Sequence, residues 1–233
     1  MKLKRPMTLK PENRGAFTLV ELLVVISIIG VLAALIIPLA GTVAVHKKIN
    51  TAQAELQQLE TALEGYKAQY GVYPPANPGS PVINPLYYEL QGVTNVNGNY
   101  QTLDGASSIP PVQYNSQFNV GGVVNSSKGS GEEMTYAKNF LPGLKATEMV
   151  LATNGTTTQF GYLVTSVGGP DVNVFGQHLI AGQNPFRYAY PGTNNPGSYD
   201  LWIQLSINST PGHQHFYLIC NWTQQVLRNS PLP

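Results

Sequence analysis

The longest apolar segment of the chain lies near its start, where no residue from Leu22 to Val45 carries a charge. At a helical rise of roughly 1.5 Å per residue, this segment is about long enough to cross a hydrocarbon core of ~30 Å. The pattern therefore predicts a membrane-spanning helix. Because proline removes a backbone donor and clashes with the preceding turn, we expect a kink at Pro38.

The helical pattern continues beyond the apolar run, but with a single hydrophobic face. Apolar residues recur there at spacings of three and four positions: Ala52, Leu56, Leu59, Leu63, Tyr66 and Tyr70. This spacing is typical of a helix that packs one stripe against a folded body. Gly71 and the pair Pro74 and Pro75 end the pattern. We therefore expect one long helix from Phe17 to about Tyr70.

Strand patterns are concentrated in the last third of the chain. In residues 199–207 the odd positions are apolar and the even positions, apart from Trp202, are polar. This alternation is typical of a half-buried strand. Residues 160–167, 186–190 and 215–222 are further predicted strands, with a turn at 211–212. Together they predict a small antiparallel sheet whose apolar face packs on the helical stripe.

These patterns predict an α+β fold with a long N-terminal helix on a small antiparallel sheet. Residues 72–145 are rich in Pro, Gly, Asn and Ser, which predicts irregular structure, and residues 95–131 have the character of a loop-rich insertion. The expected organisation is then as follows: a leader at 1–16, an apolar transmembrane and assembly helix at 17–46, an amphipathic helix at 47–71 and a globular domain at 72–233.

The distribution of charged residues predicts how the chain is oriented across the membrane. The leader carries five basic residues and Glu12, a net charge of +4, and basic flanks stay on the cytoplasmic side of a membrane. The globular domain should therefore lie on the other side. Only 11% of all residues are charged, and we expect no nucleic acid partner. The single Cys220 cannot form an internal disulfide, and we expect it to be a small buried apolar residue.

Two features distinguish the N-terminus from an ordinary secretory signal. The small residues Gly15 and Ala16 precede the apolar run instead of following it, so cleavage there would leave the helix on the mature protein. Glu21 places an ionisable group near the entrance of the run, where a charge at mid-bilayer depth costs roughly 2.5 to 3.5 kcal/mol. Glu21 therefore needs a partner, unless it lies at the membrane interface.

Residues 15–22, GAFTLVEL, resemble the class III signal of type IV prepilins and pseudopilins. The resemblance implies cleavage by prepilin peptidase between Ala16 and Phe17, methylation of the new Phe17 amine, and Glu21 as the fifth mature residue. The family usually has glycine before the cut, where this chain has Ala16. Gly30 and Pro38 also match the family's helix, in which the segment between these positions loosens on assembly.

A second resemblance lies in the globular domain. Residues 184–188, 190–192 and 198–202, together with the neighbourhoods of 73–75 and 89–90, look like parts of the major pseudopilins of type II secretion. Those proteins often bind calcium through acidic residues after the matching Leu-Trp pair. Here that pair is followed by residues 203–208, IQLSIN, without a carboxylate. Because calcium favours several oxygen ligands including carboxylates, we expect no metal and no cofactor.

Other candidate chemistry is weak. His213 and His215 are spaced like metal ligands, but no third ligand lies nearby in the sequence, and a solvated turn is the preferred interpretation. No nucleophile elbow, phosphate-binding loop or clustered acid pair occurs in the sequence. We therefore expect that the protein is not an enzyme.

The resemblance implies a structural filament subunit of the inner membrane, with its body in the periplasm, that polymerises into a pseudopilus for type II secretion. It implies these partners: further copies of the chain, prepilin peptidase, the inner-membrane assembly platform, minor pseudopilins and membrane lipid. In the filament, Glu21 would pair with the Phe17 ammonium of a neighbour and set axial register. The alternative is a type IV pilin of surface fibres or a surface-binding module, with residues 95–131 as the contact region.

Processing is directly testable by intact mass. Protein isolated from cells with an active prepilin peptidase should lack residues 1–16 and carry one added methyl group on Phe17. A mature chain that begins beyond Glu21, or after Val45 as for an ordinary signal peptide, would contradict the predicted cleavage.

Overall fold

The computed structural model describes residues 18–129, 133–153, 157–168, 183–210 and 213–229, without the side chains of 35–42 and 208–215. The chain divides into two compact units, residues 1–44 and 45–233. Each unit is described separately below.

One helix, α1 (Leu19–Tyr70), contributes to both units. It ends where the sequence predicts, because Gly71 adopts a φ of 77° that glycine tolerates readily. The Gly71 N–H closes the last turn on the Lys67 carbonyl at 2.8 Å. The predicted stripe is confirmed: Ala52, Leu56, Leu59, Leu63 and Tyr66 are all buried, and Tyr70 is half-buried.

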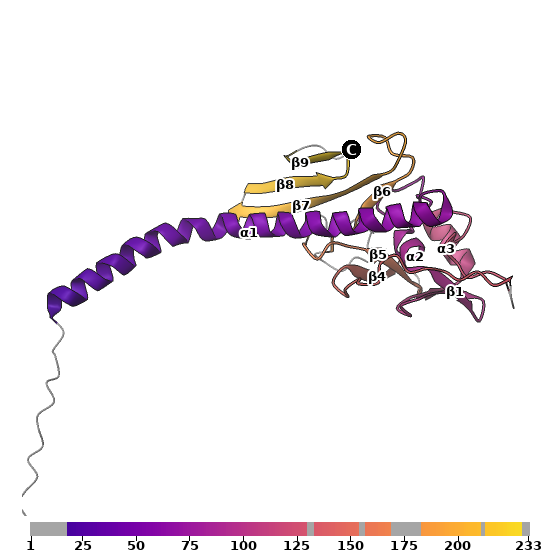
Figure 1. Cartoon of the computed structure of the whole chain (residues 1–233), viewed down its shortest axis with the longest axis horizontal. Helices are drawn as coiled ribbons and strands as arrows, with labels where there is room; N and C mark the ends of the chain where they lie inside the picture. Colours follow the sequence, from indigo (N-terminus) through magenta and orange to yellow (C-terminus); the bar gives the residue numbers. More distant parts are fainter. Residues whose placement is uncertain (1–17, 130–132, 154–156, 169–182, 211–212, 230–233) are drawn as a thin grey trace, which may run out of the picture. The chain divides into compact units, whose positions relative to one another are not determined.

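A four-stranded antiparallel sheet lies on one side of the second part of α1 (Figure 1). Its strands, in spatial order, are β6 (Arg187–Ala189), β7 (Asp200–Thr210), β8 (His213–Cys220) and β9 (Thr223–Arg228). In the register of β7 and β8, Ile203 lies opposite Ile219. The sheet confirms the strands expected at 186–190, 199–207 and 215–222. The strand β9 has no counterpart in the sequence prediction, and the turn at 211–212 lies outside the described residues.

A second layer lies on the other side of α1 (Figure 1). It contains α2 (Leu86–Gln91), β1 (Val93–Val96), β2 (Asn99–Thr102), β3 (Ser108–Ile109), α3 (Pro111–Phe118), β4 (Met149–Thr153) and β5 (Gln159–Leu163). The strands β1, β2 and β3 form one antiparallel sheet, and β4 pairs with β5 in another.

This layer corrects two expectations. Residues 72–145 are not simply irregular, because every residue of α2 is buried and the supposed insertion at 95–131 contains β2, β3 and α3. The strand expected at 160–167 is β5, which ends at Leu163 and pairs with β4, a segment without a sequence signal. A bridge between Val164 and Pro185 links the end of β5 to the segment before the four-stranded sheet. Strands of two to five residues are too short to produce a clear alternation.

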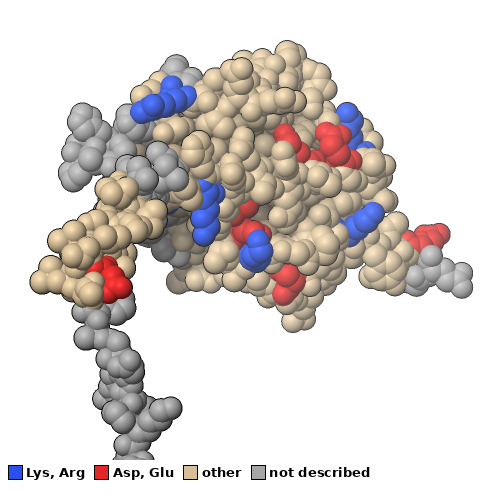
Figure 2. Space-filling view, turned by 60° about the vertical axis from the view of Figure 1, so that its left-hand side comes forward, with Lys and Arg blue, Asp and Glu red and all other residues tan. Residues whose placement is uncertain are grey.

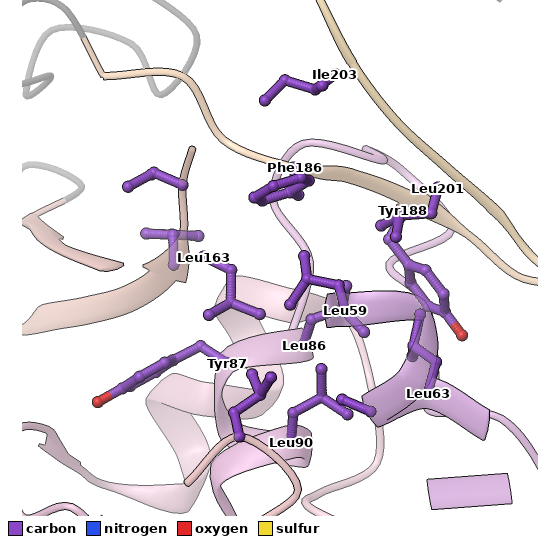
Figure 3. Packing of buried hydrophobic residues seen from close by; sticks show 14 of the residues in the cluster. Leu59, Leu63, Leu86, Tyr87, Leu90, Leu163, Phe186, Tyr188, Leu201 and Ile203 are labelled. Carbon is purple, nitrogen blue, oxygen red and sulfur yellow. The ribbon is translucent and has the colours of Figure 1, made fainter. Parts of the chain in front are cut away.

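Both layers pack on the stripe of α1. Figure 3 shows Leu59 and Leu63 between the side chains of α2 and those of β7. The shared cluster includes Leu86 and Leu90 on the α2 side and, on the sheet side, the odd positions of β7, Leu201, Ile203, Leu205 and Ile207. The apolar face assigned to residues 199–207 is therefore confirmed.

The opposite face of β7 is less polar and less exposed than the alternation predicts. Trp202, Leu218 and Cys220 form a second buried cluster against the half-buried Trp222. Gln204 also lies on this face and is only 8% exposed, so both faces of this part of β7 are buried. Cys220 is buried as predicted, and burial raises the pKa of its thiol.

The body holds few charges, and they are scattered among uncharged side chains on the face seen in Figure 2. Among the residues that the structure describes, one ion pair occurs, from the exposed Lys145 Nζ to Glu148 at 2.7 Å. An exposed pair of this kind contributes little to stability. Apolar burial and hydrogen bonds, rather than ion pairs, therefore hold the fold.

A buried carboxylate joins both helices of the second layer to α1. Glu89 of α2 is fully buried, and its Oε2 accepts hydrogen bonds from the Tyr66 hydroxyl at 2.8 Å and the Asn125 N–H at 3.1 Å. Its Oε1 accepts the Val124 N–H at 3.0 Å and the Tyr114 hydroxyl at 3.4 Å. Four donors from three separate segments thus converge on one side chain.

Burial raises the pKa of Glu89, although its hydrogen bonds act in the opposite direction. The folded chain therefore holds the proton of Glu89 more tightly than the unfolded chain does. The resulting stability is present below the ordinary pKa near 4.5 and is lost as the pH rises through the folded-state pKa.

We predict that Glu89→Gln reduces the dependence of melting temperature on pH. Wild-type protein should lose stability between about pH 5 and pH 8, and the variant should lose less, because glutamine cannot ionise. At pH 5 the variant should already be less stable by about 1 to 3 kcal/mol, since its amide group cannot accept the N–H that the second carboxylate oxygen accepts. Thermal unfolding at both pH values measures the two effects.

The exposed carboxylate of Glu133 provides the matched control. Glu133→Gln should follow the wild-type pH dependence. Equal pH dependence in the wild type and in Glu89→Gln would show that Glu89 does not titrate differently on folding.

Candidate assembly site

The first turn of α1 contains the candidate residue Glu21. Thr18 lies just before the helix, and its carbonyl accepts the Leu22 N–H at 3.2 Å. The Thr18 hydroxyl accepts the Glu21 N–H at 3.2 Å, while Glu21 Oε2 accepts the Thr18 N–H at 2.8 Å and the Thr18 hydroxyl at 2.7 Å. This reciprocal pairing is a capping box, which satisfies backbone donors that a helix start leaves free.

The capping box gives Glu21 a hydrogen-bonding partner within its own chain. Sequence reasoning missed it, although the spacing Thr18-Leu-Val-Glu21 directly before an apolar run is its known signature. In the single chain the carboxylate is thus hydrogen-bonded by its own N-cap residue. The pairing with the Phe17 amine of another copy stays a prediction.

The helix that follows is surrounded by exposed apolar side chains. Between Leu19 and Leu32 the large apolar residues are 44% to 78% exposed. Leu22 to Ile26 are consecutive, and at roughly 100° per residue five consecutive positions surround the helix. A helix that is apolar on every side is typical of one buried among other helices or in lipid.

In the part of the chain that the structure describes, no helix combines the length and apolar character needed to cross a membrane. The span predicted at 22–45 includes residues 35–42, whose side chains lie outside the described residues.

The structure leaves the other sequence-predicted site residues as predictions. Ala16 and Phe17 lie outside the described residues. Gly30 lies within α1, and a Cβ placed on it would meet no atom within 4 Å. Pro38 also lies within α1, but its side chain is among those not described. The kink expected there is therefore not tested.

The family resemblance implies calcium after the pair Leu201 and Trp202, but residues 203–210 belong to β7. The loop before β7 is organised by Asp200. This buried carboxylate accepts the backbone N–H groups of Thr193, Asn194 and Asn195 at 2.8 to 2.9 Å, and the Asn194 side-chain amide at 3.0 Å. N–H groups point their positive ends at the carboxylate, where a cation would need oxygen atoms. These hydrogen bonds therefore allow Asp200 to stabilise the conformation of its own loop.

Within the described residues, no group of three His, Cys, Asp or Glu side chains is arranged to hold a metal ion. The side chains of His213 and His215 lie outside those residues. The expectation that the chain binds no metal stays a prediction.

Comparison with known proteins agrees with the geometry of the helix start. Residues 13–37 match the model of the prokaryotic N-terminal methylation motif. The chain thus carries a prepilin-type methylation motif at the start of α1, and its α+β fold is consistent with a pilin-like fold.

A particular relative is the Type II secretion system core protein G of Pseudomonas aeruginosa. It is 32% identical to this chain over 68 residues, which is 29% of the chain and 48% of the relative. The chain therefore matches about half the length of that curated relative. No solved structure matches the chain.

We predict that calcium does not stabilise the protein. Adding a chelator should leave the melting temperature unchanged, whereas Asp200→Asn should lower the stability by about 1 to 3 kcal/mol with or without calcium, because buried N–H groups lose an acceptor. Thermal unfolding in calcium and in chelator makes this measurement. A clear decrease on chelation of the wild type would refute the prediction.

Proposed function

We propose that this protein is a pseudopilin, a structural subunit that polymerises from the inner membrane into a periplasmic filament serving type II protein secretion. The main support is the methylation motif at 13–37 directly joined to a helix with apolar side chains on every side. A helix of this kind is stable in water only when other apolar surfaces cover it. Membrane lipid covers it before assembly, and the helices of other copies cover it afterwards.

In this proposal, prepilin peptidase removes residues 1–16 and methylates Phe17, and the mature subunit stays anchored in the inner membrane. The assembly platform then adds subunits to a filament that also contains minor pseudopilins. The resemblance to a type II secretion core protein supports this choice of machinery. The protein performs no catalysis in this role.

Glu21 acts during assembly by exchanging one partner for another. In the single subunit its carboxylate is bonded to Thr18. In the filament it binds the methylated ammonium of Phe17 in a neighbouring subunit, where the low dielectric strengthens the attraction and penalises an unpaired charge. This pairing sets how far one subunit rises above the next.

A type IV pilin of surface fibres is the second candidate. Val112 at the start of α3 is 79% exposed and lies within 95–131, the segment expected to contact a surface. Deleting the gene separates the two candidates. Loss of protein export with unchanged surface fibres supports the pseudopilin, and loss of fibres or adhesion supports the pilin.

We predict that Glu21→Val inserts into the membrane normally and fails to polymerise. Removal of the charge lowers the cost of insertion, but filament yield should fall about tenfold or more, because an uncompensated Phe17 ammonium in the bundle costs several kcal/mol. Cleavage and filament yield are measured in cells without a wild-type copy.

The control is Thr18→Ala, which removes the hydroxyl of the capping box and keeps the carboxylate. Its cost should be about 1 kcal/mol at the helix start, and its filaments should form. If Thr18→Ala and Glu21→Val lose filaments equally, the helix cap explains the defect. Filaments of normal yield from Glu21→Val would show that apolar packing alone determines assembly.

A further inference from the structure

An open groove of about 570 Å³ lies between α1 and the hairpin of β8 and β9. None of its lining residues belongs to the N-terminal segment 13–37, and the groove lies entirely in the unit 45–233. Its volume lies within the range of about 300 to 1,000 Å³ that is typical of small-ligand sites. The proposed filament function does not require it.

Four glutamine side chains from two elements line the groove: Gln53 and Gln57 of α1, and Gln224 and Gln225 of β9. Within the part of the chain that the structure describes, these four amide groups have no hydrogen-bond partner in the protein. Each amide offers two donors and one acceptor with two lone pairs. A hydroxyl group, which both donates and accepts, is the natural complement of such a side chain.

An aromatic ring is fixed at the same groove. Trp222 lines it and contacts the buried Trp202 at 5.8 Å between ring centroids, with the ring planes at 67°. The preceding residue, Asn221, anchors the turn between β8 and β9. Its side chain accepts the Leu201 N–H and donates to the Tyr199 carbonyl, both at 2.9 Å. The half-buried Trp222 therefore follows an anchored residue, packs against Trp202 and contributes an apolar surface to the groove beside the amides.

The charge of the groove excludes anionic ligands. No Lys, Arg or His is among its lining residues, all of which the structure describes, and the single ionisable carboxylate is Glu60. Burial, together with the neighbouring Glu64, raises the pKa of Glu60. A half-buried carboxylate is a strong acceptor for hydroxyl donors and repels phosphate, sulfate or other carboxylates.

We propose that this groove binds a neutral oligosaccharide, with the glutamine amides and Glu60 bonding its hydroxyl groups and Trp222 packing against a sugar ring. Sugar rings combine a hydroxyl-rich edge with an apolar C–H face, and the groove offers a partner for each. The amides lie on two different elements instead of in one regular row. They suit scattered hydroxyls better than the evenly spaced main-chain groups of an extended peptide.

The intrinsic fluorescence of the full-length chain tests the proposal, because the chain contains only two tryptophans and one of them is buried. The protein is held in a zwitterionic detergent, since a detergent with a sugar headgroup would compete. Maltotetraose and chitotetraose, tetramers of glucose and of N-acetylglucosamine, are titrated separately. At least one should give a saturable change in Trp222 emission.

The double variant Gln57→Ala with Gln224→Ala should weaken that binding about tenfold or more, through the loss of two amide partners. Glu60→Gln, which keeps the shape of the side chain, should weaken it as well. The matched control is Gln69→Ala, an exposed glutamine of α1 that does not line the groove, and it should bind like the wild type. Unchanged melting temperatures verify that the variants are folded.

No saturable response to either tetramer would overturn the proposal, as would equal affinity in the wild type and the double variant. A neutral Gly-Ser octapeptide is titrated in parallel. Saturable binding of this peptide without a response to the sugars would also overturn the proposal and would assign the groove to polypeptide chains.

Discussion

Burial of one stripe of α1 is the constraint on which the rest of the body depends. Leu59 and Leu63 belong to the same apolar cluster as α2 on one side and β7 on the other. At roughly 25 cal/mol per Å² of apolar surface removed from water, this shared stripe stabilises both layers at once. A change at the stripe therefore affects the two layers together. Because the described residues form one ion pair, the other specific contacts between the layers are hydrogen bonds.

Tyrosine hydroxyls provide part of the polar contacts in this interior. The Tyr66 hydroxyl donates to Glu89, that of Tyr87 to Asp104 and that of Tyr188 to the Pro74 carbonyl, each at 2.8 Å. A buried hydroxyl without a partner would cost about 1 to 3 kcal/mol. Each of these rings therefore adds apolar area and also fixes a specific neighbour. Tyrosine in this chain performs the positioning that charged pairs perform in many other proteins.

The sequence predicts those parts of the fold in which a hydrophobic pattern repeats several times along one element. The stripe from Ala52 to Tyr66 and the odd positions of β7 repeat often enough to reveal a helix and a strand. The second layer could not be predicted, because β3 has only two residues, and α2 has only six, which are all buried. Glu89 gave no signal either, since its N–H donors at 124 and 125 are 35 and 36 residues away along the chain. In the candidate assembly site, the sequence points to Glu21 as the candidate residue. The local spacing also encodes the hydrogen bonds between Glu21 and Thr18, but these were not predicted.

The hydrogen bonds near the end of α1 also have a mechanical meaning. Tyr66 binds Glu89, and one turn later the Tyr70 hydroxyl donates to the Asn125 side chain at 2.7 Å, while that side chain donates to the Glu89 carbonyl, also at 2.7 Å. A tensile load on residues 45–70 would pass through these bonds directly into α2 and the loop at 124–125. These hydrogen bonds must break together before the helix slides, so they share the load. The body would therefore follow a moving helix as one piece instead of peeling away from it strand by strand.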